Sequence, residues 1–154
     1  MAILRPKRKR HIEWHLDNFY INGEPFSFEE YPSLIDLYMD EYEDIVLPKS
    51  AQAGLSVFAI SRSLYVCDEL QGTAMYLFPS ANHIGDFVQH RIDPAIKDSP
   101  RLNQLRIKGL TSDQKDKFKK SADKVRLKKI NKGFMYFRGT QSLMEVTSTP
   151  ADMI

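Results

Sequence analysis

The sequence predicts an α/β domain in which helices cover both faces of a mostly parallel sheet. Apolar runs of strand length alternate along the chain with segments whose apolar residues recur every three to four positions. The chain of 154 residues is 42% hydrophobic and 27% charged, which is typical of one globular domain. Its single cysteine excludes an internal disulfide framework. We therefore expect a three-layer core that is stabilised by packing.

The first elements are a turn, a helix and a strand. Asn22-Gly23 lies between apolar pairs and predicts a two-residue hairpin turn. Residues 29–42 combine apolar positions at helical spacing with a run of acidic residues, so they predict a helix with one apolar and one acidic face. The short apolar run at 44–48 (DIVLP) predicts a buried strand after that helix.

A helix and a strand follow in the same order. Residues 55–70 carry apolar side chains at three- to four-residue spacing and predict a helix. Gln71-Gly72 is expected to end it, with glycine in the usual C-terminal position. The continuous apolar run at 73–78 (TAMYLF) predicts the second strand.

The remaining elements are one more helix and a hairpin. Residues 81–97 predict a helix with Ser80 as its N-cap and a kink at Asp93-Pro94. The runs at 124–130 and 133–138 alternate as strands do, on either side of an Asn-Lys-Gly turn.

The net charge of +2 conceals two basic segments. We expect residues 1–15 to form a basic N-terminal tail and residues 16–154 to form the domain. Residues 101–132 are strongly basic but poor in aromatic side chains, so they predict either a nucleic-acid surface or a solvated loop. No apolar run is long enough to span a membrane. The candidate DNA contacts are Lys117, Lys119, Lys120, Lys128 and Lys129.

The segment between the first predicted strand and the next helix has the chemistry of a phosphate-binding loop. The usual pattern is G-x-x-x-x-G-K-[ST] between a strand and a helix. Gly54 and Ser56 match it in register, whereas Leu55 replaces the lysine and Lys49 replaces the first glycine. Small residues let the backbone approach a phosphate, and a helix start presents its amides to an anion. The candidate nucleotide-binding residues are Lys49, Ser50, Ala51, Gln52, Ala53, Gly54, Leu55 and Ser56.

The loop sequence KSAQAGLS resembles the deviant Walker A motif of the large terminase subunit of tailed bacteriophages, in which the lysine lies at the front of the loop. Its six matching positions are Lys49, Ser50, Ala51, Gln52, Gly54 and Ser56, while Ala53 replaces the usual valine. The segments FYINGEPFSFEEYPSLIDLY, TAMYLFPSANHIGDFVQHRIDPAIKDSP and GFMYFRGTQS are similar to the family in the same order. STPADMI looks like the lead-in to Walker B, so the resemblance covers nearly everything after about residue 15.

This resemblance implies a P-loop (RecA/ASCE-like) ATPase core that is incomplete at its C-terminus. It implies ATP and Mg²⁺ as cofactors, with Lys49 as the catalytic cation on the β- and γ-phosphates and Ser56 as the Mg²⁺ ligand. The implied partners are double-stranded DNA, the portal protein and the small terminase subunit, in a homo-oligomeric ring of the full-length protein in the host cytoplasm. The Walker B aspartate, the catalytic glutamate and the nuclease domain of the family are expected beyond Ile154, so this chain alone is expected to hydrolyse little ATP.

Two other functions fit the same residues. One is a fragment of a helicase-like DNA translocase, which shares the core, and the other is a non-catalytic nucleic-acid-binding or assembly module that keeps the loop as a relic. Nucleotide binding separates the second from the ATPases, because a relic would bind no ATP·Mg and would not respond to Lys49→Ala.

Several other residues have ordinary structural interpretations. The HIEWH segment lacks a third ligand, which disfavours a zinc site at His11 and His15. Cys67 fits a helix core position, and His83 and His90 are expected at the surface. The aromatic residues Trp14, Phe26, Phe28 and Tyr31 are typical of a core, and the resemblance allows one of them to flank the adenine. Arg138 closes the last strand, either as part of a turn or as a charge near nucleotide or DNA.

Overall fold

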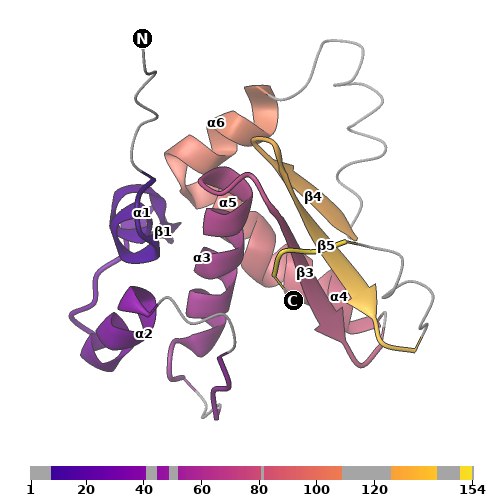
Figure 1. The fold of residues 1–154 in the computed structure, drawn as a ribbon, viewed down its shortest axis with the longest axis horizontal. Helices are drawn as coiled ribbons and strands as arrows, with labels where there is room; N and C mark the ends of the chain where they lie inside the picture. The colour runs from indigo at the N-terminus through magenta and orange to yellow at the C-terminus, as the bar shows by residue number, and fades with distance from the viewer. Residues whose placement is uncertain are drawn as a thin grey trace, which may run out of the picture.

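A computed structural model describes residues 8–40, 45–48, 52–80, 82–108, 126–141 and 150–153. A three-stranded sheet lies beside a group of helices (Figure 1). The elements are α1 (His11–Asn18), β1 (Tyr20–Ile21), β2 (Glu24–Pro25), the 3-10 helix η1 (Pro32–Leu34), α2 (Ile35–Met39), α3 (Leu55–Asp68), β3 (Thr73–Phe78), α4 (Asn82–Phe87), the π-helix η2 (Val88–Ile92), α5 (Asp93–Asp98), α6 (Pro100–Lys108), β4 (Leu127–Ile130) and β5 (Gly133–Gly139).

The sheet is mixed, with the strand order β3-β5-β4. β3 is parallel to β5, and β4 pairs antiparallel with β5. Every strand residue of the main core lies on one face of this sheet, as Ala74, Met135 and Phe137 illustrate. That core also contains Leu64 of α3 and Ile96 of α5, so these helices cover the same face. The described residues thus form an α/β arrangement of two layers, and the predicted third layer is not confirmed.

The hairpins and the central helix and strand agree with the sequence. Asn22 and Gly23 have positive φ angles of 54° and 81°, which gives the tight turn between β1 and β2. The predicted strand at 73–78 is β3, and β4 and β5 form the predicted second hairpin. The helix predicted over 55–70 is α3, which ends at Asp68.

The end of α3 differs in detail from the expected glycine stop. The left-handed residue after the helix is Gln71, with φ 56°, rather than Gly72. The N–H of Gly72 donates to the carbonyl of Val66, which satisfies one of the free carbonyls at the helix end.

The predicted boundary between a tail at 1–15 and a domain after it falls inside a helix. α1 begins at His11, and the side chains of Trp14 and His15 are fully buried. Two of the buried residues of this helix are histidines, so its buried face does not appear as an apolar pattern in the sequence. The run of basic residues before residue 11 adds to the impression of a solvated tail. Residues 1–7 lie outside the described part of the chain.

The acidic helix is much shorter than the predicted 29–42. It consists of η1 and α2, which together cover 32–39, and Glu29 and Glu30 lie in a turn before them. Pro32 sets the start, since proline fits the first turn of a helix and lacks the N–H needed further in.

The prediction of a strand at 44–48 is wrong for residues 45–48, which the structure describes. Residues 45–48 have no regular secondary structure, and the side chain of Val46 is 94% exposed. A strand needs a neighbour for its backbone groups. On the edge of β3 that faces away from β5, the backbone groups of Thr73 and Met75 form hydrogen bonds of 2.7–3.2 Å with Asp152 and Met153. Residues 45–48 therefore do not pair with that part of the edge.

The helix predicted over 81–97 is interrupted as expected, but by a π-helical turn. η2 separates α4 from α5, and the N–H of Asp93 bonds to the carbonyl of Val88, five residues earlier. Pro94 follows directly and has no N–H for the carbonyl four residues before it, which favours a local change of helix type. The next helix, α6, was expected only as part of a basic segment, yet its Leu102 is fully buried.

Candidate nucleotide-binding site

The loop before α3 bends sharply at two described residues. Gln52 has φ 58° and Gly54 has φ 72°, both in the left-handed region. Gly54 is the N-cap of α3, and its carbonyl accepts the hydrogen bond of Phe58 N–H at 3.0 Å. The first amides of α3 therefore follow directly on a tight turn, and free amides at a helix start can bind an anion. Lys49, Ser50 and Ala51 lie outside the described residues.

The segment around η1 packs directly against this bend. A Cβ atom on Gly54 would lie 2.6 Å from Leu34 Cδ1 and 3.3 Å from Tyr31 Cδ1. Leu34, Tyr38 and Phe58 form a small hydrophobic cluster that holds α2 against the first turn of α3. The close approach and the positive φ together explain why the position is glycine.

A hollow of about 240 Å³ lies between the start of α3 and the carboxyl end of β3. Ser56 and Leu55 of α3 line it on one side, and Tyr76 and Phe78 of β3 line it on the other. In open α/β sheets, ligands bind outside the carboxyl ends of the strands. Among the α3 residues that line this hollow, Ser56 is the one with a polar side chain.

The family model of the phage terminase large subunit gpA, ATPase domain, matches residues 25–154. The chain belongs to this terminase family. The match includes the whole loop and both sides of the hollow, and family membership supports a phage DNA-packaging ATPase role. No curated protein and no solved structure matches the chain.

Two negative observations apply to the described part of this terminase chain. It contains no helix that is both long and apolar enough to cross a membrane. It also contains no group of three or more His, Cys, Asp or Glu side chains that could hold a metal ion.

The two histidines of the HIEWH segment meet at a serine of α3. Ser61 Oγ lies 2.9 Å from His11 Nε2 and 2.6 Å from His15 Nδ1. Burial lowers the pKa of His11 to about 2, with a further contribution from the charge of Arg62, and burial lowers the pKa of His15 to about 3. Both rings are therefore neutral at neutral pH, and they fix α1 to the middle of α3.

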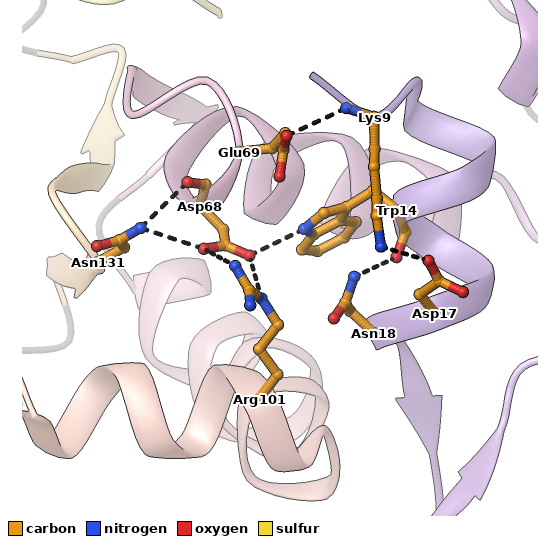
Figure 2. Close-up of polar contacts among 8 residues, drawn as sticks. All are labelled: Lys9, Trp14, Asp17, Asn18, Asp68, Glu69, Arg101 and Asn131. Carbon is orange, nitrogen blue, oxygen red and sulfur yellow. Dashed lines mark hydrogen bonds and ion pairs between the residues drawn. The ribbon is translucent and has the colours of Figure 1, made fainter. Parts of the chain in front are cut away.

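A buried carboxylate holds the far end of α3 (Figure 2). Asp68 Oδ2 accepts hydrogen bonds from Trp14 Nε1 and from Arg101 Nε, each at 2.9 Å. Asn131 Nδ2 donates to Asp68 Oδ1 and to the Asp68 carbonyl, each at 3.3 Å. One carboxylate thus connects α1, α3, α6 and the β4–β5 turn, which fixes the C-terminal end of α3.

The structure separates the aromatic candidates for adenine. Trp14 is fully buried beside Asp68, and Phe26 and Phe28 pack their rings against His15. Tyr31 is half-buried and contacts the loop at Gly54. Of the four, Tyr31 is the one that the structure places beside Gly54.

The basic candidates differ in their surroundings. Lys117, Lys119 and Lys120 lie outside the described residues. Lys128 is 3% exposed, and its Nζ is 2.8 Å from Asp93 Oδ1. Lys129 is half-buried, with its Nζ 5.7 Å from the centre of the Phe134 ring. Arg138 lies over Tyr136, its guanidinium carbon 4.9 Å from the ring centre.

Sequence reasoning missed the residues that support the site. The roles of Asp68, Arg101 and the two buried histidines depend on contacts between segments 33 to 63 residues apart. The local signal for α6 is Pro100, because proline is common at the first position of a helix. His83, His90 and Cys67 are placed as expected, the first two exposed and the last fully buried.

Proposed function

We propose that residues 49–56 bind the phosphates of ATP·Mg and that the protein uses ATP hydrolysis to move double-stranded DNA into a procapsid. The observation that carries the proposal is the family match, which spans a glycine-dependent bend at the start of α3 beside a hollow. A P-loop ATPase needs such a turn, because the phosphates are held mainly by backbone amides.

Each loop residue has a role that follows from its chemistry. The Lys49 ammonium is the cation for the β- and γ-phosphates, taking the place of the lysine that usually follows the last glycine. The amides of the Gly54 region donate to phosphate oxygens, and the Ser56 hydroxyl holds Mg²⁺. When bound, Mg²⁺ neutralises part of the phosphate charge. The small side chains of Ser50, Ala51 and Ala53 leave room for the phosphates to approach the backbone.

Tyr31 is the best candidate for the residue beside the adenine. Its ring lies at the bend without being fully buried, and an aromatic face offers stacking to a base. The pairing of a phosphate loop with a neighbouring ring would fix both ends of the nucleotide.

The remaining parts of the proposal concern the whole packaging machine. We infer that the protein acts in the host cytoplasm as a ring of identical subunits, together with the portal protein, the small terminase subunit and a nuclease domain. The lysines at 117, 119, 120, 128 and 129 are proposed DNA contacts, with Lys128 available only if its ion pair with Asp93 opens.

Titration with a fluorescent ATP analogue and Mg²⁺ tests nucleotide binding. Lys49→Ala should raise the dissociation constant at least about tenfold, since a charged phosphate contact contributes about 1.4 kcal/mol or more. Lys97→Ala is the matched control, because Lys97 is an exposed lysine of α5 that does not line the hollow. Equal dissociation constants for the two variants and the unchanged protein would refute the role of Lys49.

A further inference from the structure

We propose that the outer face of the three-stranded sheet, which is turned away from α3 and α5, binds single-stranded nucleic acid by stacking unpaired bases on Phe134 and Tyr136. This face is separate from the hollow at Ser56, which is lined by α3 and by residues on the core face of β3. The inference therefore goes beyond the proposed nucleotide binding and does not depend on it.

The strand register places both rings on this outer face. The residues of β5 are alternately buried and half-buried, and the buried ones include Met135 and Phe137 of the main core. Because successive side chains of a strand point to opposite faces, the half-buried Phe134 and Tyr136 lie on the outer face. Lys129 of β4 is the register partner of Phe134, so it lies on the same face.

Each of the two rings has a cation beside it. The ring centres of Phe134 and Tyr136 are 6.3 Å apart, and the ring planes are inclined by 32°. Lys129 Nζ lies 5.7 Å from the centre of the Phe134 ring, and the guanidinium carbon of Arg138 lies 4.9 Å from the centre of the Tyr136 ring. Neighbouring rings with adjacent cations combine the two interactions that hold a single strand, which are base stacking and attraction of phosphate.

The charge on this face has one sign among the strand residues that the structure describes. Besides the two rings and their cations, the outward-facing residues are all uncharged: Thr73, Met75, Leu77 and Leu127. The carboxylate of Asp152 lies at the start of β3, where it accepts the N–H of Thr73 at 2.7 Å. Arg138 Nη1 donates to the carbonyls of Arg126 and Phe137, which holds the guanidinium without neutralising its charge. An anionic partner therefore complements this face.

The pair of rings favours a single strand over a duplex. In an intact duplex the faces of the bases are stacked on one another, whereas an unpaired base offers its face to an aromatic side chain. Attraction of a duplex backbone would need the cations alone. Met75 is only 3% exposed, so we expect the strand to lie over β5 and β4 rather than over the middle of β3.

The first test measures binding of a fluorescein-labelled oligothymidylate of about 15 nucleotides by fluorescence anisotropy. Tyr136→Leu keeps an apolar strand residue but removes the ring, and it should raise the dissociation constant about fivefold or more, the low end for one stacked base. Tyr136→Trp keeps an aromatic face and should retain the affinity. Tyr20→Leu is the matched control, because Tyr20 is a half-buried tyrosine of β1, outside this sheet.

The second test measures the salt dependence of the same binding. Replacement of Lys129 and Arg138 together by glutamine should lower the magnitude of the slope of log K against log salt by about 1.4, or about 0.7 for each phosphate contact. Lys97→Gln removes an exposed charge of α5 and should leave the slope unchanged. Circular dichroism of all variants checks that they fold as the unchanged protein does.

Equal dissociation constants for Tyr136→Leu, Tyr136→Trp and the unchanged protein would overturn the proposal, as would absence of binding. A duplex of the same length that binds as tightly as the single strand would also overturn it, because it would show attraction of phosphate alone. An oligouridylate of equal length separates the two sources of a single strand, and tighter binding of one identifies DNA or RNA. The ATP analogue is titrated on the same samples, and its binding should persist in Tyr136→Leu, so failure of this face and failure of the nucleotide site are distinguishable.

Discussion

Gly54 joins the loop to α3 in a backbone conformation that side chains rarely adopt. Its φ of 72° and its contact with Leu34 and Tyr31 make the bend depend on the missing Cβ. Because η1 presses on this residue, the geometry of the loop depends on the segment that precedes it by about twenty residues. The proposed nucleotide binding should therefore be sensitive to a position that itself carries no functional group.

Gly54→Ala should lower the free energy of unfolding by about 2 kcal/mol, from the left-handed backbone and the crowding at Leu34. It should also weaken binding of the ATP analogue. Urea denaturation and the fluorescence titration measure the two effects. Gly85→Ala is the control, since a Cβ there meets nothing within 4 Å and alanine favours the helix. A Gly54 variant as stable as the Gly85 variant would contradict the account.

The neutral histidine pair predicts loss of stability in acid. Burial lowers the folded-state pKa of His11 and His15 to about 2 and about 3, from 6.5. The unfolded chain therefore binds more protons below pH 6.5, so stability falls as the pH drops from 6.5 toward those values. At pH 4.5 the free energy of unfolding should be lower by at most about 2.7 kcal/mol per histidine.

Urea denaturation between pH 7 and pH 4.5 measures this loss. Replacement of His11 and His15 by glutamine should flatten the pH dependence, whatever it does to stability at neutral pH. Replacement of the exposed His83 and His90 by glutamine is the matched control and should retain it. An equally steep pH dependence after the His11 and His15 replacements would show that other groups cause it.

Among the elements, α3 carries both the loop and the contacts that fix it. Its first turn meets η1 and α2, its middle meets the histidines of α1, and its last residue, Asp68, meets α6 and the β4–β5 turn. The side chain of Asp68 is fully buried, so its charge must be compensated by these donors.

Arg101→Ala should lower the free energy of unfolding by about 3 kcal/mol, because it leaves a buried carboxylate without its cation. Lys9→Ala breaks a surface ion pair with Asp17 and should cost at most about 1 kcal/mol. Thermal or urea denaturation of both variants gives the comparison. Equal costs would mean that the Asp68 network does not hold the elements together.

The elements that sequence predicted well are those whose signals are local. The hairpin turn at Asn22, the strand β3 and the helix α3 follow from turn residues and periodicity over a few positions. The strand expected at 44–48 failed because an apolar run becomes a strand only beside a partner. The loop was predicted from its residue types, whereas its wall of Tyr31 and Leu34 depends on tertiary packing.

On the scale of the whole molecule, the described residues place a helical layer on one face of a small mixed sheet. The hollow at Ser56 lies between the start of α3 and the carboxyl end of β3. The proposed nucleotide site lies at this end of the sheet, where open α/β sheets bind their ligands.

The most direct test of the account is a crystal structure with a non-hydrolysable ATP analogue and Mg²⁺. The account predicts the phosphates at the start of α3, with the Lys49 ammonium within about 3 Å of a β- or γ-phosphate oxygen and the Ser56 hydroxyl on the metal. An analogue bound elsewhere, or bound at the loop with the Lys49 side chain directed away from the phosphates, would contradict it.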